Sequence, residues 1–324
     1  MKTKNLSLIL ATLLSAGLTA CNSGGSNPAS KNTQNAVAES AVEALTTPNN
    51  SYSAGVVLTS DGNLDYYKND KFMGKLWHFE DTPVAVDMVA SYSGDAIWVV
   101  YVGTVTGELK RCTIQENLST ECSTIGSQLV QFPGSMQSIK MDIKLQDIQG
   151  IKMDVNGTGY VVSNSGSGSV LKYVNNELVD TQSLSFPSND SHSKGIEWYG
   201  DNLYFVHGPY LFKYSLTDTQ LTEVSEVSGD NGISFDRNLT GYLIDSKHSL
   251  YRIEAGKQTR TVHSFVGEPI SVSALTDNTI YVGTVEKSFL GIYTYELHKC
   301  DGSGNCATID SFGTAPNAIA FRQR

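Results

Sequence analysis

The feature that most constrains this chain of 324 residues is a strand pattern that recurs along it. Its clearest sign is a pair of matching segments, ELKRC…ECSTIGS at residues 108–127 and ELHKC…NCATIDS at residues 296–311. Each predicts a strand, a short polar turn and a second strand. Because two such similar hairpins lie far apart in the chain, they indicate a repeated structural unit.

From Ser53 onward each repeat predicts four successive strands, and each class of strand occurs six times. The second strands, for example, are GVVLTS, IWVVYV, YVVSNS, LYFVHG, YLIDSK and IYVGTV. The first strands begin at Val84, Ile151, Ile196, Ile233, Ile270 and Ile319. The last of these, NAIAF, lies at the C-terminus, whereas the repeat that begins near Ala54 has no first strand of its own. We therefore expect the C-terminal strand to complete the N-terminal repeat.

This arrangement resembles a β-propeller, in which one blade is built from both chain ends so that no sheet edge stays open. The resemblance implies an all-β fold, a six-bladed β-propeller over residues 53–324 with four-stranded blades. An irregular β-sandwich is the alternative. The repeat between the second and third blades is longer than the others, and residues 131–147 hold the excess. They are expected to form an excursion over one face or a degenerate strand.

The first twenty residues predict a targeting segment. Lys2 and Lys4 precede the apolar run LSLILATLLSAGL, and Leu18-Thr-Ala-Cys21 follows it. This pattern resembles the bacterial lipobox, which implies cleavage before Cys21 and a lipid on its sulfur that binds the membrane. The alternatives are an ordinary secretory signal or a transmembrane helix, but the run is shorter than the roughly 20 residues that spanning needs.

The resemblance also implies a cellular location. Asn22 follows the lipobox cysteine, and in lipoproteins a residue other than Asp at this place implies the outer membrane of a Gram-negative bacterium. Residues 21–52 are rich in Ser, Asn, Gly and Ala and hold few large apolar side chains. Such a composition predicts a flexible tether. The formal charge of −10 argues against a nucleic acid partner, because phosphate is also negative.

Four cysteines remain once Cys21 is assigned to lipid: Cys112, Cys122, Cys300 and Cys306. An even number in an exported protein favours disulfides, and four cysteines allow three connectivities. Pairing within each hairpin fits best, because antiparallel strands bring the two residues of each pair close. A zinc site made by all four cysteines is the alternative, although the spacing lacks C-x-x-C. We expect a structural role.

A candidate binding site follows from aligning the first strands. The residue two positions before the aligned apolar residue is polar or charged in every repeat. These residues are Thr82, Gln149, Lys194, Asn231, Glu268 and Asn317. Six-fold symmetry would place them in a ring at the mouth of the central channel, where converging polar groups indicate a ligand site. The alternative is that strand starts are polar because water solvates them.

The stretch NGISFD…GYLIDSKHSLYRIE, residues 231–254, resembles the senescence-marker/gluconolactonase-like and strictosidine-synthase-like propellers. The lactonase resemblance implies a divalent metal at the channel mouth that activates water. Asn231 matches the family's Asn, and Glu268 and Asn317 are the other candidate ligands. The chain departs from that family where Asn317 stands in place of its ligand Glu.

Other chemistry has little support in the sequence. There is no G-x-S-x-G or H-E-x-x-H motif, and no catalytic residue is assigned. The turns DVNGTG at residues 154–159 and DRNLTG at residues 236–241 are similar to calcium loops but lack the later carboxylate. We predict an envelope lipoprotein whose propeller binds or scaffolds an envelope protein or small ligand, with no cofactor. The alternative is a metal-dependent hydrolase of the lactonase type.

Overall fold

The computed structural model describes residues 52–92, 94–125, 127–131, 138–142, 148–163, 168–184, 186, 193–227, 231–235, 240–254 and 257–324. Cys21 and the predicted tether lie outside the described residues. Within the described part every regular element is a strand, and no helix is long and apolar enough to cross a bilayer. The prediction of an all-β fold is confirmed.

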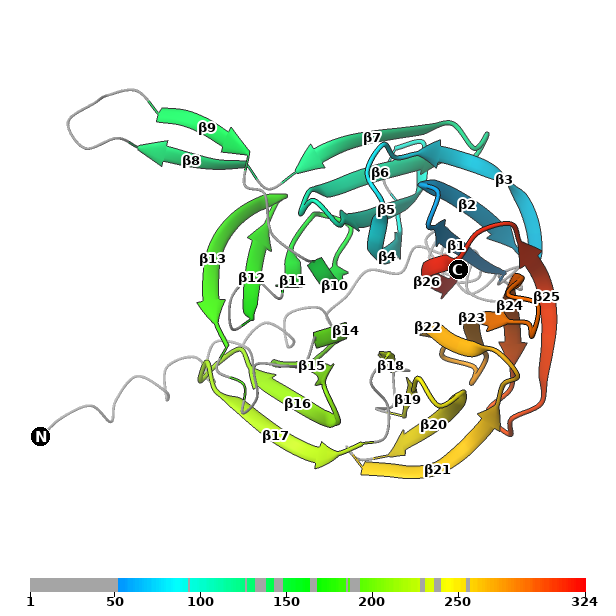
Figure 1. The fold of residues 1–324 in the computed structure, drawn as a ribbon. Helices are drawn as coiled ribbons and strands as arrows, with labels where there is room; N and C mark the ends of the chain where they lie inside the picture. The colour runs from blue at the N-terminus through cyan, green and yellow to red at the C-terminus, as the bar shows by residue number, and fades with distance from the viewer. Residues whose placement is uncertain are drawn as a thin grey trace, which may run out of the picture. The chain divides into compact units, whose positions relative to one another are not determined.

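Six four-stranded antiparallel sheets stand around a common axis as the blades of a propeller (Figure 1). Blade 1 holds β26 (Pro316–Gln323), β1 (Ser53–Thr59), β2 (Asn63–Lys68) and β3 (Lys71–His78). Blade 2 holds β4 (Pro83–Ala90), β5 (Ala96–Thr104), β6 (Leu109–Gln115) and β7 (Thr120–Ile125). Blade 3 holds β10 (Ile148–Met153), β11 (Gly159–Ser163), β12 (Ser169–Val174) and β13 (Glu177–Ser183).

The remaining three blades follow the same order from the channel outward. Blade 4 holds β14 (Ser193–Tyr199), β15 (Asn202–His207), β16 (Tyr210–Ser215) and β17 (Leu221–Glu226). Blade 5 holds β18 (Gly232–Phe235), β19 (Gly241–Ile244), β20 (Ser249–Glu254) and β21 (Lys257–Ser264). Blade 6 holds β22 (Glu268–Ala274), β23 (Ile280–Lys287), β24 (Tyr293–Cys300) and β25 (Cys306–Phe312). The repeat inferred from the sequence is therefore confirmed as six blades of four strands.

Blade 1 joins the two ends of the chain. β26 is its innermost strand and pairs antiparallel with β1, with Ser53 opposite Gln323 and Val57 opposite Ile319. Tyr52 and Arg324 also exchange backbone hydrogen bonds of 3.1 and 3.0 Å. The predicted closure is confirmed, and it leaves no inner strand without a partner in blade 1.

The long repeat between blades 2 and 3 contains an additional hairpin. β8 (Ser127–Gln131) pairs with β9 (Ser138–Asp142) in a two-stranded sheet of its own. Figure 1 shows this hairpin projecting outward from the ring beside β13. The described part of the excess, Gln131 and Ser138–Asp142, therefore belongs to a separate hairpin and not to a blade.

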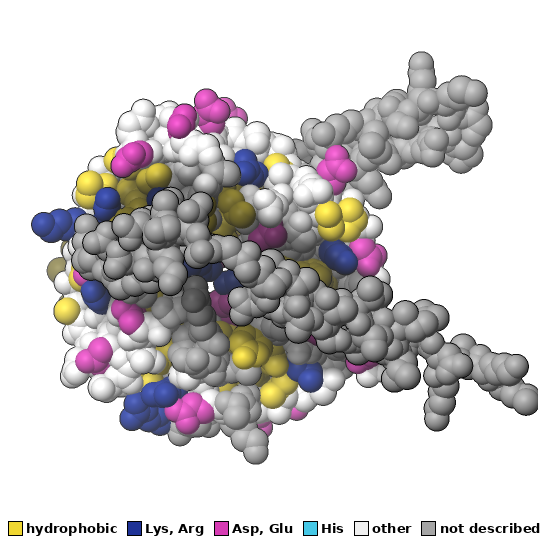
Figure 2. Space-filling view, turned by 180° about the vertical axis from the view of Figure 1, so that it is seen from behind, with side chains coloured by type: hydrophobic (Ala, Val, Ile, Leu, Met, Phe, Trp, Pro, Cys, Tyr) yellow, Lys and Arg dark blue, Asp and Glu magenta, His cyan; other side chains and the backbone are white. Residues whose placement is uncertain are grey.

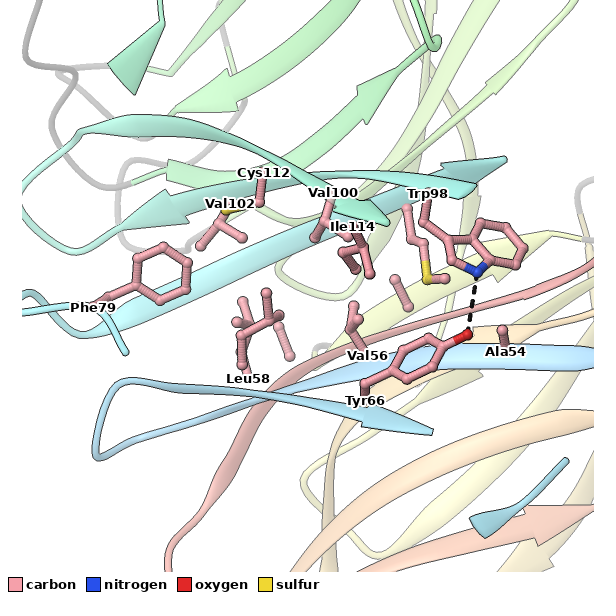
Figure 3. Packing of buried hydrophobic residues seen from close by; sticks show 14 residues of the cluster. Ala54, Val56, Leu58, Tyr66, Phe79, Trp98, Val100, Val102, Cys112 and Ile114 are labelled. Carbon is pink, nitrogen blue, oxygen red and sulfur yellow. Dashed lines mark hydrogen bonds between the residues drawn. The ribbon is translucent and has the colours of Figure 1, made fainter. Parts of the chain in front are cut away.

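Hydrophobic side chains fill the spaces between neighbouring blades. Between blades 1 and 2 they come from alternate positions of β1, β2 and β5, as Figure 3 shows. Val56, Leu58, Trp98 and Val100 are fully buried there, and the Trp98 indole donates a 3.3 Å hydrogen bond to the Tyr66 hydroxyl. Because each face of a strand meets a different blade, both faces are apolar, which explains the continuous apolar runs of the second strands.

Both predicted disulfides form within hairpins. Cys112 of β6 is bonded to Cys122 of β7, and Cys300 of β24 is bonded to Cys306 of β25. In each pair the two residues lie directly opposite in the strand register. Cys112 and Cys300 are fully or almost fully buried, each within a core between two blades. A zinc site shared by the four cysteines is excluded by this pairing.

Candidate functional site

The centre of the propeller contains a cavity of about 500 Å³. All six inner strands line it, because each blade turns its first strand toward the axis. Figure 2 shows the molecule from the side opposite to Figure 1, with basic and acidic side chains beside the central opening. On the part of that face drawn in colour, the two signs are interspersed with hydrophobic side chains.

The strand register shows which residues occupy equivalent places at the channel mouth. A bulge follows Pro83 in β4, Ile148 in β10 and Pro269 in β22. Aligned on this bulge, the equivalents of Gln149 in blades 2 and 6 are Val84 and Ile270. These two apolar residues line the cavity, as do Gln149, Asn231 and Asn317. The mouth is thus part polar and part apolar, unlike the uniform polar ring expected from the sequence.

The other predicted ring residues lie elsewhere or outside the described side chains. Thr82 and Glu268 stand two positions earlier in the register and do not line the cavity. The backbone of Lys194 is in β14, but its side chain is outside the described part. In blades 2 and 6 the bulge residues Val84 and Ile270 are themselves apolar, so apolar spacing aligned them with Ile151 in place of Val86 and Val272, two residues later.

Three of the predicted ring residues were also the candidate metal ligands. The Asn231 amide donates 3.1 Å hydrogen bonds to Glu268 Oε1 and to the Pro269 carbonyl oxygen. The Asn317 amide donates a 3.0 Å bond to the Pro83 carbonyl oxygen, on the opposite side of β26 from Glu268. The structure therefore brings Asn231 and Glu268 together and directs Asn317 toward blade 2. As a donor set, one carboxylate beside one amide fits a divalent cation only in part.

The described residues contain no group of three or more His, Cys, Asp or Glu side chains arranged to hold a metal ion. The DVNGTG turn is stabilised internally, since Asp154 Oδ1 accepts hydrogen bonds of 2.9 and 2.8 Å from the backbone N–H groups of Asn156 and Thr158. This is the turn-capping role of Asp. Most of the second such turn, residues 236–239, is outside the described part.

Deeper in the channel a belt of β-branched side chains follows the mouth. Two residues after the mouth position each inner strand carries Val or Ile. These are Val86, Ile151, Ile196, Ile233, Val272 and Ile319, and all line the cavity. Beside them neighbouring strands approach closely; a Cβ on Gly150 would lie 2.8 Å from the Ile196 side chain. The belt is therefore apolar and rigidly packed.

Below the belt lies a chain of charged groups that the sequence reasoning did not identify. Arg322 Nη2 lies 2.5 Å from Asp87 Oδ1, and Lys152 Nζ lies 3.9 Å from the same oxygen. Lys152 Nζ also lies 2.8 Å from Glu197 Oε2, and Ser234 donates a 3.3 Å bond to Glu197 Oε1. We call Arg322, Asp87, Lys152 and Glu197 the channel floor. Five inner strands contribute to this network.

A signal for part of this floor exists in the sequence. The residue after the belt position is Asp87, Lys152, Glu197, Ser234 or Ser273 in five blades, and in each case a tyrosine stands opposite on the second strand. The opposing residues are Tyr101, Tyr160, Tyr204, Tyr242 and Tyr281. In blade 1 this position is Ala320, and Arg322 follows two residues later on β26. A polar residue paired with tyrosine thus marks the floor in the repeat.

Comparisons with known proteins add little to this description. No protein-family model matches the chain, and no curated protein matches it either. Among solved structures, apo AztD from Citrobacter koseri is similar, with 9% sequence identity and a TM-score of 0.48. The match covers 84% of this chain and 98% of that one.

Proposed function

We propose that this chain is an envelope-anchored lipoprotein whose propeller is a binding module that takes a small ligand in its central channel. The observation that carries the proposal is the layered cavity, with a partly polar mouth, an aliphatic belt and a charged floor. Binding sites combine such apolar walls with a few fixed polar groups. The anchor rests on the lipobox pattern that ends at Cys21.

Mutual pairing of the floor residues supports recognition, because it fixes their orientation. Asp87 keeps 2% of its surface exposed and accepts a 3.0 Å bond from the Met153 backbone N–H. The Ser234 hydroxyl, besides its bond to Glu197, accepts a 3.0 Å bond from the Ala274 backbone N–H. Groups held in place before the ligand arrives lose little entropy on binding.

A separate observation supports the scaffolding form of the proposal. β23 and β24 continue for three residue pairs past Thr284, whereas the inner strand β22 has almost ended there. In the turn that joins β23 and β24 the Ser288 N–H donates a 2.8 Å hydrogen bond to the Ile292 carbonyl oxygen. At this tip Phe289 is 100%, Leu290 77% and Ile292 61% exposed. Clustered exposed apolar side chains are typical of protein contact sites.

The channel proposal predicts that narrowing the mouth weakens ligand binding. The full chain is screened by thermal shift against small carboxylates, sugars, amines and nucleosides, and hits are quantified by calorimetry. Val84→Trp places a large side chain at the mouth, so hits should weaken at least tenfold. Val179→Trp, at an exposed position of β13, is the matched control and should bind like the wild type.

Equal binding to Val84→Trp would show that the ligand sits outside the channel, and a screen without hits would remove the small-ligand proposal in favour of scaffolding. Acylation is tested by mass spectrometry of the N-terminal peptide, with Cys21→Ser as the control that should lose the lipid. The hydrolase alternative predicts a bound divalent cation by elemental analysis and lactone hydrolysis that Asn231→Ala abolishes.

A further inference from the structure

The two cations of the channel floor are more exposed than its two anions. The side chains of Lys152 and Arg322 keep 19% and 26% of their surface exposed, whereas Asp87 keeps 2% and Glu197 keeps 11%. All four residues line the cavity. A molecule that reaches the floor therefore meets ammonium and guanidinium groups first, with the carboxylates behind them.

The hydrogen bonds at the floor also differ between the carboxylates and the cations. Each carboxylate oxygen already has a partner: Arg322 and Lys152 on Asp87 Oδ1, the Met153 N–H on Asp87 Oδ2, Lys152 on Glu197 Oε2, and Ser234 on Glu197 Oε1. Arg322 has five N–H donors. Its bonds to other described residues use Nη2, toward Asp87, and Nη1, toward the Phe321 carbonyl oxygen at 3.0 Å. Lys152 and Arg322 keep N–H donors that these contacts do not use, and they are the more exposed groups, which favours an acceptor on the ligand.

We propose that the channel binds a small monocarboxylate with an aliphatic body. Its carboxylate accepts hydrogen bonds from Lys152 and Arg322, and its hydrocarbon part lies against the belt of Val and Ile side chains. This inference rests on the proposed binding function and names the ligand class of that site. An amine of the same shape would face the two more exposed cations, and the carboxylates behind them already have partners on each oxygen.

The charge balance of the floor favours one negative charge over two. The two cations and two anions among the described floor residues cancel. A monocarboxylate therefore leaves the site with one net negative charge, whereas the further charge of a phosphate would add to this repulsion and carry a larger desolvation cost. The apolar belt adds to this preference, because a compact anion without a hydrocarbon part gains nothing from it.

The first test compares ligands of matched length by calorimetry on the full chain. Straight-chain carboxylates from acetate to octanoate should bind progressively more tightly, by about fourfold for each methylene that enters the belt. Primary alcohols and amines of the same length should bind at least tenfold more weakly, and inorganic phosphate should not compete. Equal binding of alcohols, amines and carboxylates would overturn the anion preference, while the channel would remain a binding site.

The second test removes one cation with its own partner, so that no buried charge is left alone. Arg322→Gln combined with Asp87→Asn should weaken carboxylate binding at least tenfold and weaken the binding of an alcohol of the same length by clearly less. Arg324→Gln is the matched control: Arg324 lies beside the Tyr92 and Trp98 rings and does not line the cavity. Thermal unfolding without ligand verifies that each variant folds.

The outcomes separate the two proposals. If Val84→Trp blocks a hit of another class and no carboxylate binds, the binding module stands and the monocarboxylate assignment is overturned. If carboxylates bind equally to the wild type and to the Arg322/Asp87 double variant, the floor does not recognise them. If no ligand of any class binds, both proposals fail.

Discussion

Asp65 is a buried carboxyl group in the interface where blade 1 meets blade 6. Asp65 lies on β2, directly opposite Val57 of β1. The Val57 side chain belongs to the core between these blades. The Asp65 side chain is 6% exposed, and its Oδ1 atom has no hydrogen-bond partner among the described residues. Burial raises the pKa of Asp65 to about 6, with smaller contributions from the negative charges of Asp61 and Asp310 and against the positive charge of Lys75.

Replacing this carboxyl should stabilise the protein in a pH-dependent way. The folded chain holds the Asp65 proton more tightly than the unfolded chain, in which the pKa of this carboxyl is near 3.8. The free energy of unfolding therefore falls as the pH rises from 4 to 6. Above pH 6 the ionised group costs about 3 kcal/mol. Asp65→Asn should therefore raise the free energy of unfolding by up to this amount at pH 8 and leave it almost unchanged at pH 4. Urea titrations at the two pH values measure the difference.

Asp95→Asn serves as the control, because Asp95 is exposed in the β4–β5 turn and should show no effect at either pH. An equal gain at pH 4 and pH 8 for Asp65→Asn would mean that packing, rather than ionisation, sets the change. Because the folded state binds the Asp65 proton more tightly, the contribution of Asp65 to the stability of the wild-type protein is less favourable at pH 8 than at pH 5.

At the scale of elements, the second disulfide holds a loop that the neighbouring blade contacts. The β24–β25 turn lies between Cys300 and Cys306, and Asp301 Oδ1 accepts 2.9 and 3.0 Å bonds from two backbone N–H groups of that turn. Arg260 of blade 5 donates a 3.0 Å bond to the Gly302 carbonyl oxygen, and His263 Nδ1 lies 3.0 Å from the Gly304 oxygen. The disulfide thus stabilises a contact between blades 5 and 6.

Removing either disulfide should reduce the stability of the oxidised protein. Each bridge closes a short loop, with sequence separations of 10 and 6 residues, and the chain-entropy account gives about 2–3 kcal/mol for each. Cys300→Ala with Cys306→Ala should lose this amount and also the contacts of the loop with Arg260. Cys112→Ala with Cys122→Ala should lose the entropic part. Free energies of unfolding with and without reductant check both, since the variants should lose sensitivity to reductant at the missing bridge.

The strands were predictable from the sequence because their apolar positions repeat, and the site was predictable only in part. Ile151, Ile196 and Ile233 precede Lys152, Glu197 and Ser234, so the inner strands show the same local order in three blades. In blades 2 and 6 an apolar residue, Val84 or Ile270, stands at the bulge two residues before the belt, so the apolar pattern pointed to Thr82 and Glu268. The salt bridge of Asp87 with Arg322 joins residues 235 positions apart, and no local pattern specifies such a pair.

At the scale of the whole molecule, closure depends on a tight fit between the two chain ends. Phe321 of β26 stacks on Tyr281 of blade 6, with ring centroids 3.7 Å apart. Its ring also occupies the space beside Gly55, where a Cβ atom would lie 2.2 Å from Phe321 Cδ1. The Asp70 carboxylate continues the same interface, accepting a 2.7 Å bond from the Tyr281 hydroxyl and lying 2.6 Å from Lys299 Nζ.

A methyl group at Gly55 should therefore destabilise the closure. Gly55→Ala forces the Phe321 ring to move and should cost about 1–3 kcal/mol of unfolding free energy. Phe321→Leu alone should also destabilise, but the double variant should be more stable than the sum of the two single losses predicts. A double-mutant cycle by urea denaturation measures this coupling. Strict additivity would contradict the contact.

The position of β26 also sets the order in which the chain can fold. Translation proceeds from the N-terminus, so β1 emerges more than 250 residues before the strand that covers its inner edge. Until Pro316–Gln323 is made, blade 1 has three strands and the cavity has five walls. The ring therefore closes only after β26 is made, and a stop codon or a protease cut before Pro316 removes one wall of the site as well as its Arg322.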